Sequence, residues 1–146
     1  MQAGQVTDDV LEDKLRAGGL KPTRQRLRVL QELAAEDSDV TATELHRRLR
    51  ADGNRIGLAT VYRTLNALAG SGVIDSFSHH PGESCYRLCG EGHHHHLVCT
   101  SCHRVVELEE CGLDNWLAKI ATAADFEPTD HRVEVLGLCS ACRVAA

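Results

Sequence analysis

The chain has 146 residues, of which 42% are hydrophobic and 3% aromatic, and its formal net charge is -5. The hydrophobic fraction excludes general disorder, and no apolar stretch approaches the roughly 20 residues that a membrane-spanning helix needs. The charge is uneven, because residues 1–74 carry 11 Lys/Arg against 10 Asp/Glu, whereas residues 75–146 carry 5 against 11. A cationic block in the first part suits nucleic acid, and the carboxylates, histidines and cysteines of the second part suit cations.

The N-terminal segment has no apolar signal-peptide core, and carboxylates crowd it at Asp8, Asp9, Glu12 and Asp13. We therefore expect a cytoplasmic protein, in which cysteine thiols stay reduced. The seven cysteines are an odd number, which favours metal binding over a disulfide framework.

Four helices are predicted in the first half of the chain. Gly18-Gly19 ends the first, Pro22 fits the first turn of the second, and Thr41 with Glu44 forms a capping box before the third. The expected ranges are 8–17, 22–35, 42–52 and 57–70.

The fourth of these helices has two distinct faces. Apolar residues at helical spacing predict its buried face, at Leu58, Val61, Leu65 and Leu68. The polar side chains between them suit contacts with phosphates and base edges, namely Thr60, Tyr62, Arg63, Thr64 and Asn66.

A β-hairpin is predicted after the fourth helix. Its strands cover 73–77 and 85–88, and its turn lies at 79–82. Helices followed by a hairpin indicate a winged helix-turn-helix domain over residues 1–88. A hinge is expected at 89–92, where the composition changes.

The second domain is expected to span residues 93–146. Patterns of apolar residues predict two strands around the first Cys-x-x-Cys pair, then a helix, then a strand that leads into the second pair. The expected ranges are 95–99, 105–108, 113–124 and 131–138.

Two Cys-x-x-Cys pairs, Cys99/Cys102 and Cys139/Cys142, carry the strongest chemical signal in the chain. Each pair can bring two sulfurs to one ion, and four thiolates close a tetrahedral structural zinc site. A redox dithiol or a set of buried thiols is the alternative interpretation. The remaining Cys85 and Cys111 are interpreted as ordinary packing residues.

A run of four histidines, His93 to His96, directly precedes the first cysteine pair. Alternate side chains of an extended segment share a face. His94 and His96 should therefore point one way, and His93 and His95 the other. A solvated histidine run or a purification tag is the alternative to a metal site.

The chain resembles the ferric uptake regulator (Fur) family of metal-dependent repressors over about residues 8–143. Four segments carry the resemblance: Gly19–Arg26, Ile56–Leu65 with its Ala-Thr-Val-Tyr-Arg core, His93–Cys102 and Gly137–Cys142. It implies a mixed α/β (α+β) fold, with an N-terminal winged helix and a C-terminal α/β dimerisation domain that contains an antiparallel sheet. It also implies a homodimer that binds palindromic double-stranded operator DNA, with no membrane partner and no enzymatic activity.

Within the family, the chain is most similar to the zinc-uptake regulator branch. The iron sensors usually carry a metal-binding Glu and a His where this chain has Arg87 and Asp39, and His-His-Asp-His where it has four histidines. The zinc sensors use a cysteine just after the second wing strand, where Cys89 lies. A thiolate shifts metal preference from Fe(II) towards zinc.

The resemblance implies two or three zinc ions per subunit. Metal at the second site would join the two domains and act as a switch, whereas the third site belongs to the second domain alone. The family pattern has Glu at the third site where this chain has Asp114. The implied ligand sets are structural Cys99, Cys102, Cys139 and Cys142; regulatory Asp75, Cys89, His94 and His96; and a third set of His93, His95, Asp114 and His131.

DNA contacts are expected from two groups of residues. Tyr62 and Arg63, with Thr60, are the candidates on the recognition helix, although Arg63 on a merely solvated helix face is the alternative. Arg24, Arg26 and Lys14 are expected at phosphates.

Other functions remain as alternatives to a zinc-responsive repressor. One is a sensor in the same fold for iron, nickel, manganese or peroxide, although a peroxide sensor with an Asp/His-rich iron site does not fit Cys89. A zinc-dependent enzyme needs an open coordination position and a general base. The sequence contains neither an HExxH motif nor the HxE…PCxxC arrangement of zinc deaminases.

Overall fold

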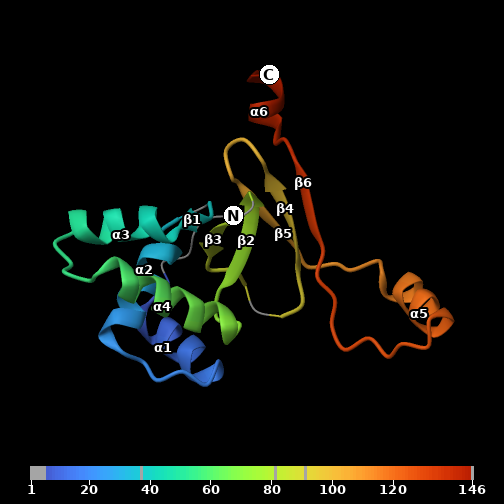
Figure 1. Cartoon of the computed structure of the whole chain (residues 1–146), viewed down its shortest axis with the longest axis horizontal. Helices are drawn as coiled ribbons and strands as arrows, with labels where there is room; N and C mark the ends of the chain where they lie inside the picture. Colours follow the sequence, from blue (N-terminus) through green and yellow to red (C-terminus); the bar gives the residue numbers. More distant parts are fainter. Residues whose placement is uncertain (1–5, 37, 81, 91, 146) are drawn as a thin grey trace. The chain divides into compact units, whose positions relative to one another are not determined.

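The structure is a computed structural model that describes residues 6–36, 38–80, 82–90 and 92–145. It divides into two compact units, Met1–Cys89 and Gly90–Ala146 (Figure 1). The predicted turn at 79–82 includes Pro81 and the predicted hinge at 89–92 includes Glu91, and these two residues lie outside the described ranges.

The first unit contains the four predicted helices: α1 (Asp8–Ala17), α2 (Arg24–Ala34), α3 (Ala42–Ala51) and α4 (Leu58–Gly70). Helix α2 begins after Thr23, whose side chain accepts a hydrogen bond from the Arg26 backbone N–H. Pro22 therefore precedes the cap instead of occupying the first turn as expected. Thr41 caps α3 as predicted, because its Oγ1 accepts the Glu44 N–H at 3.1 Å.

A three-stranded antiparallel sheet completes the first unit. It contains β1 (Val40–Thr41), β2 (Asp75–His80) and β3 (Glu83–Arg87), in the order β1-β3-β2. The hairpin of β2 and β3 is the predicted wing. Strand β1 was not predicted, because two residues are too few to show a period of two.

The core of the first unit is aliphatic, as the scarcity of aromatic residues requires. All four helices contribute fully buried side chains, and the sheet contributes Val40 and Tyr86. On α4 the buried face differs from the expected one, because Leu58 is 37% exposed whereas Thr64 is 8% exposed. Thr64 is therefore unsuited to the DNA contact expected of it, and it is one of the buried residues of α4, with Val61, Leu65 and Leu68.

The second unit is built on a three-stranded sheet in the order β5-β4-β6. Its elements are β4 (His95–Cys99), β5 (Val105–Leu108), α5 (Asp114–Ala123), β6 (Glu134–Gly137) and α6 (Ser140–Ala145). Strands β4 and β5 are antiparallel, but β4 and β6 run parallel, so the sheet is mixed and not wholly antiparallel as expected. Helix α6 was not predicted; it begins inside the second Cys-x-x-Cys pair.

The second unit buries little of its apolar surface. Its buried residues, among those that the structure describes, are His95, Val98, Cys99 and Val105. Helix α5 has no buried residue, and all four residues of β6 are exposed. This surface includes large apolar side chains, the most exposed of which in α5, β6 and the segment between them are Trp116, Phe126 and Leu136. No helix in the described part of the chain is long and apolar enough to cross a membrane.

Candidate metal centres and nucleic-acid interface

The four cysteines of the two Cys-x-x-Cys pairs come together in the second unit. Their Sγ atoms all lie within 4.8 Å of one another. The Sγ atoms of Cys102 and Cys139 are 3.8 Å apart, and a tetrahedral ion with Zn–S bonds of about 2.3 Å separates its sulfurs by roughly 3.8 Å. The pairing of β4 with β6 explains this arrangement, because Cys99 lies opposite Gly137 in the parallel register.

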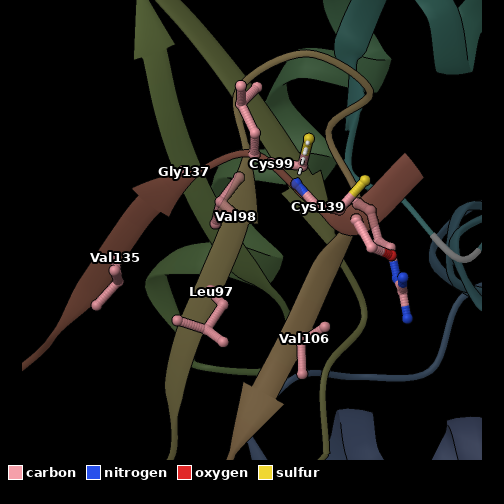
Figure 2. A pocket seen from close by; sticks show the side chains of 10 residues that line it. Leu97, Val98, Cys99, Val106, Val135, Gly137 and Cys139 are labelled. Atoms are coloured by element: carbon pink, nitrogen blue, oxygen red, sulfur yellow. Dashed lines mark hydrogen bonds between the residues drawn. The ribbon is translucent and has the colours of Figure 1, made fainter. Parts of the chain in front are cut away.

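The backbone around this cluster stabilises negative charge on sulfur. Hydrogen bonds from the Cys102 and Cys139 backbone lower the pKa of Cys99 to about 5, and one of these, from Cys139 N–H, is 3.4 Å long (Figure 2). A bond from the Cys142 backbone likewise lowers the pKa of Cys139. At Cys142 the effect of a Ser101 hydrogen bond is outweighed by the neighbouring sulfurs, which raise its pKa to about 11. Thiolates crowded in this way favour a bound cation.

The histidine run alternates as predicted. The rings of His94 and His96 are 4.7 Å apart, and those of His93 and His95 are 4.6 Å apart. A hydrogen bond of 2.8 Å joins His94 Nδ1 to the Gly92 carbonyl. Because a carbonyl only accepts, Nδ1 carries the proton, which leaves Nε2 as the nitrogen with a lone pair for metal.

A second cluster lies on the other face of the run. His93, His95, His131 and Cys111 offer ligand atoms that all lie within 4.8 Å of one another. Burial, followed by the neighbouring His93 and His131, lowers the pKa of His95 and so favours the neutral imidazole that binds metal. The fourth residue differs from the expected Asp114, which is absent from every such group among the described residues.

The four residues expected for the regulatory site belong to both units, two in each. In the first unit, Asp75 pairs with Arg87 across β2 and β3. Cys89 follows β3 by two residues, is 8% exposed, and has Arg87 Nη1 at 3.6 Å from its sulfur. Asp75 and Cys89 therefore lie at the same end of the wing. The second unit supplies His94 and His96.

A helical unit with a wing, followed along the chain by a unit that holds sulfur and imidazole clusters, agrees with what comparison with known proteins finds. A family model described as the ferric uptake regulator family matches residues 17–136. The chain belongs to the ferric uptake regulator family. Members of this family are metal-responsive transcriptional regulators and not enzymes, so membership confirms the expected functional class and excludes the zinc-dependent enzyme.

Individual Fur-family relatives match most of the chain. The zinc uptake regulation protein of Mycobacterium tuberculosis (strain CDC 1551 / Oshkosh) is 44% identical over 127 residues, which cover 87% of this chain and 98% of that protein. The ferric uptake regulation protein of Escherichia coli K12 is 35% identical over 127 residues, 86% of each. A solved zinc uptake regulator complexed with zinc and DNA is similar with a TM-score of 0.74 at 26% identity, covering 94% of this chain and 93% of that one. The expected fold class is thereby confirmed.

The exposed face of α4 presents the residues expected to read DNA in this Fur-family protein. Tyr62 is 43% exposed. Arg63 is exposed and donates a hydrogen bond of 3.3 Å to Thr60 Oγ1. Asn66 is held differently, because its Oδ1 accepts a bond from the Tyr86 hydroxyl at 3.3 Å. Tyr62 and Arg63 are therefore the residues of this face best placed to meet a base edge.

The cationic block of the first unit is partly neutralised within the fold. Arg16 pairs with Glu12 at 2.8 Å, and Arg28 pairs with Asp52 at 2.7 Å. Arg26 donates to the Lys21 carbonyl at 2.7 Å, and Lys14 is half-buried. Arg24 is exposed and makes no ion pair with any residue that the structure describes.

Two residues that were given no site role from the sequence lie beside the candidate sites. Arg55 is exposed and lies two residues before Gly57, the cap of α4. That position next to the expected recognition helix was the sequence signal that could have indicated it. Cys111 was interpreted as a packing residue. Its position three residues before the expected ligand Asp114 was the sequence signal that could have indicated a place near the third site. Cys85 behaves as interpreted, because it is 1% exposed and burial raises its pKa to about 12.

Proposed function

We propose that this chain is a zinc-responsive transcriptional repressor of the cytoplasm. In this proposal a zinc-loaded homodimer binds palindromic double-stranded operator DNA of zinc-uptake genes and releases it when zinc is scarce. The observation that carries the proposal is the buried Cys89, which lies two residues after β3 at the same end of the wing as Asp75. In this proposal its sulfur would join that carboxylate and the imidazoles of His94 and His96. Sulfur and imidazole ligands favour zinc over the oxygen-rich surroundings that suit Fe(II) and Mn(II).

The structural zinc is assigned to Cys99, Cys102, Cys139 and Cys142. Their mutual distances and the lowered pKa of Cys99 support this assignment. Bound zinc would neutralise the crowded thiolates and cross-link the two cysteine pairs. The cross-link would secure a unit whose own apolar core is small.

The regulatory zinc is assigned to Asp75, Cys89, His94 and His96. The wing brings Asp75 towards Cys89, and alternation along the histidine run brings His94 towards His96. His94 lies five positions after Cys89, so the chain itself limits them to about 18 Å apart at full extension. A metal held by both pairs would tie the winged-helix domain, residues 1–88, to the second domain, residues 93–146, across a hinge at 89–92. Such a tie restricts the orientation of α4 and so acts as a switch.

Zinc is proposed over the other metals on two grounds. One is the ligand chemistry of Cys89. The other is the similarity to a zinc uptake regulation protein at 44% identity, against 35% for a ferric uptake regulation protein. A third ion, held by His93, His95 and His131, brings the total to three per subunit, and without it the total is two.

The homodimer is supported by the unpartnered apolar surface of the second unit. Leu97, Val106 and Val135 are paired across β4, β5 and β6, so they form one row on the same face of the sheet. All three are more than a third exposed. They line a pocket of about 290 Å³, shown in Figure 2, whose lining also includes Cys99 and Cys139. An exposed apolar face of this kind marks an interface, and a symmetric dimer is the commonest way to cover it.

A charge in this apolar row should prevent dimerisation. We expect Val135→Glu to sediment as a monomer, because a second copy would then have to bury an unpaired carboxylate. Thr129→Glu, at an exposed position of the segment before β6, is the matched control and should remain a dimer. Analytical ultracentrifugation of the zinc-loaded proteins makes the comparison, and a dimeric Val135→Glu would place the interface elsewhere.

DNA recognition is assigned to the exposed face of α4. Tyr62, Arg63 and Thr60 would meet the operator, and two copies of α4 in a dimer would read the halves of a palindrome. Arg24, Arg26 and Lys14 would meet phosphates, which provide affinity without sequence preference.

Arg63→Ala should weaken operator binding by about 1–3 kcal/mol and leave the metal content unchanged. Arg24→Ala is the comparison variant, and it should weaken specific and non-specific DNA alike and reduce the salt dependence. The measurement is fluorescence anisotropy with operator and scrambled duplexes at several salt concentrations. Normal operator binding by Arg63→Ala would mean that another surface reads the DNA.

A further inference from the structure

The cluster on the outer face of the histidine run has a thiol as its fourth member. Cys111 Sγ lies 3.1 Å from His131 Nε2, and His131 Nε2 lies 3.2 Å from His93 Nε2. The ring of His95 is 5.1 Å from that of His131. All four residues belong to the second unit. One imidazole nitrogen thus has a sulfur and a second nitrogen at close range.

The nitrogen–nitrogen separation is close to that of two ligands around one ion, and the sulfur–nitrogen separation is somewhat shorter. Tetrahedral zinc with bonds of about 2.0–2.1 Å to nitrogen and 2.3 Å to sulfur places two nitrogens roughly 3.3 Å apart, and nitrogen and sulfur roughly 3.6 Å apart. His95 adds a second sign, because its Nε2 is buried and has no hydrogen-bond partner among the described residues. Metal bound at this nitrogen would leave the ring proton on Nδ1, and the 3.3 Å hydrogen bond that Nδ1 accepts from the Val133 N–H would then be lost.

Asp114 is placed differently from Cys111. It is the first residue of α5, it is exposed, and its carboxylate belongs to none of the ligand groups found among the described residues. Cys111 lies three residues after the end of β5, where the chain is still close to the sheet that positions His95. The short link from β5 therefore carries a thiol to the cluster before α5 begins.

We propose that Cys111, and not Asp114, completes a third metal site made of His93, His95, Cys111 and His131. This inference rests on the proposed function and changes the chemistry of its third ion. Three imidazoles and a thiolate form a softer ligand set than three imidazoles and a carboxylate, so the site selects zinc more strongly against Mn(II) and Fe(II). Four protein ligands leave no open position, so the site has no catalytic role.

Metal stoichiometry tests which residue is the ligand. Full-length wild type, Cys111→Ala and Asp114→Asn are equilibrated with the same buffered zinc, and zinc per subunit is measured by mass spectrometry of the element. We expect three ions in wild type and in Asp114→Asn, and two in Cys111→Ala. The affinity for the third ion should fall by more than about tenfold in Cys111→Ala, because changes to groups that merely orient a ligand already cost about 10–100-fold.

Cobalt reports sulfur ligation directly. In a Cys89→Ser background that retains its structural zinc, Co(II) at the third site should show thiolate-to-cobalt charge-transfer absorption. Cys111→Ala in the same background should lose that absorption. Asp114→Asn should keep it.

The proposal is overturned by loss of the third ion in Asp114→Asn, by its retention in Cys111→Ala, by only two ions in wild type, or by a cobalt site without the sulfur band. None of these results tests the proposed repressor function itself. That function fails separately, if wild-type protein does not bind operator DNA in response to zinc.

Discussion

Replacing Cys99 with Ser should remove the structural zinc and prevent the second unit from folding. Structural zinc contributes on the order of 10 kcal/mol in small zinc domains, and the few buried side chains of this unit cannot replace it. Cys139→Ser should behave in the same way, because its sulfur belongs to the same cluster. Zinc content, circular dichroism and sedimentation of the purified variants make the measurement, and the expected product is a zinc-depleted monomer.

The matched control for this prediction is Cys111→Ser. It makes the same chemical change in the same unit, yet it should leave the structural zinc, the fold and the dimer intact. A Cys99→Ser protein that stays dimeric with its structural zinc would contradict the four-cysteine assignment.

Replacing Cys89 with Ser should abolish zinc-dependent operator binding without unfolding either unit. Cys89 is separate from the aliphatic core of the first unit and from the four-cysteine cluster of the second. The variant should therefore keep its dimer and its structural zinc. Without the sulfur, zinc no longer favours one orientation of the two domains, so added zinc can shift no population towards the DNA-binding state.

His93→Ala provides the contrast, because it removes a ligand of the third site on the opposite face of the run. This site lies within the second unit, so its loss should shift the zinc response to higher zinc without eliminating it. Both variants are compared by operator binding against buffered free zinc. A normal response in Cys89→Ser together with no response in His93→Ala would mean that the sensor lies on the other face of the strand.

Local signals predicted much of the first unit. The glycines after α1, the Thr41 cap and the apolar stripe of α4 gave four helices whose ends differ from the observed ones by at most two residues. The apolar stripe of α4 did not predict that Leu58 is exposed and Thr64 is buried. A residue in the first turn of a helix can be exposed whatever its hydrophobicity. The start of α2 was placed two residues too early, since both Pro22 and Thr23 are good helix-start residues.

Contacts between distant segments were harder to predict. The parallel pairing of β4 with β6 joins residues about 40 positions apart, and no local pattern carries the direction of a strand. The same pairing explains why the two cysteine pairs meet, which ligand chemistry alone had already indicated. The position of Cys111 beside His131 was not predicted for a related reason, because it depends on the loop after β5 and not on sequence spacing.

The central claim, that zinc is the signal, is tested most directly by a metal-by-metal titration of operator binding. The duplex is one selected from random sequence by the zinc-loaded wild-type protein, and Zn(II), Fe(II), Mn(II) and Ni(II) are each buffered at defined free concentrations without oxygen. We expect zinc to support operator binding at a far lower free concentration than any other metal does. Operator binding by Cys89→Ser should not respond to zinc. Tighter operator binding with Fe(II), Mn(II) or Ni(II) at their buffered concentrations than with zinc would contradict the account.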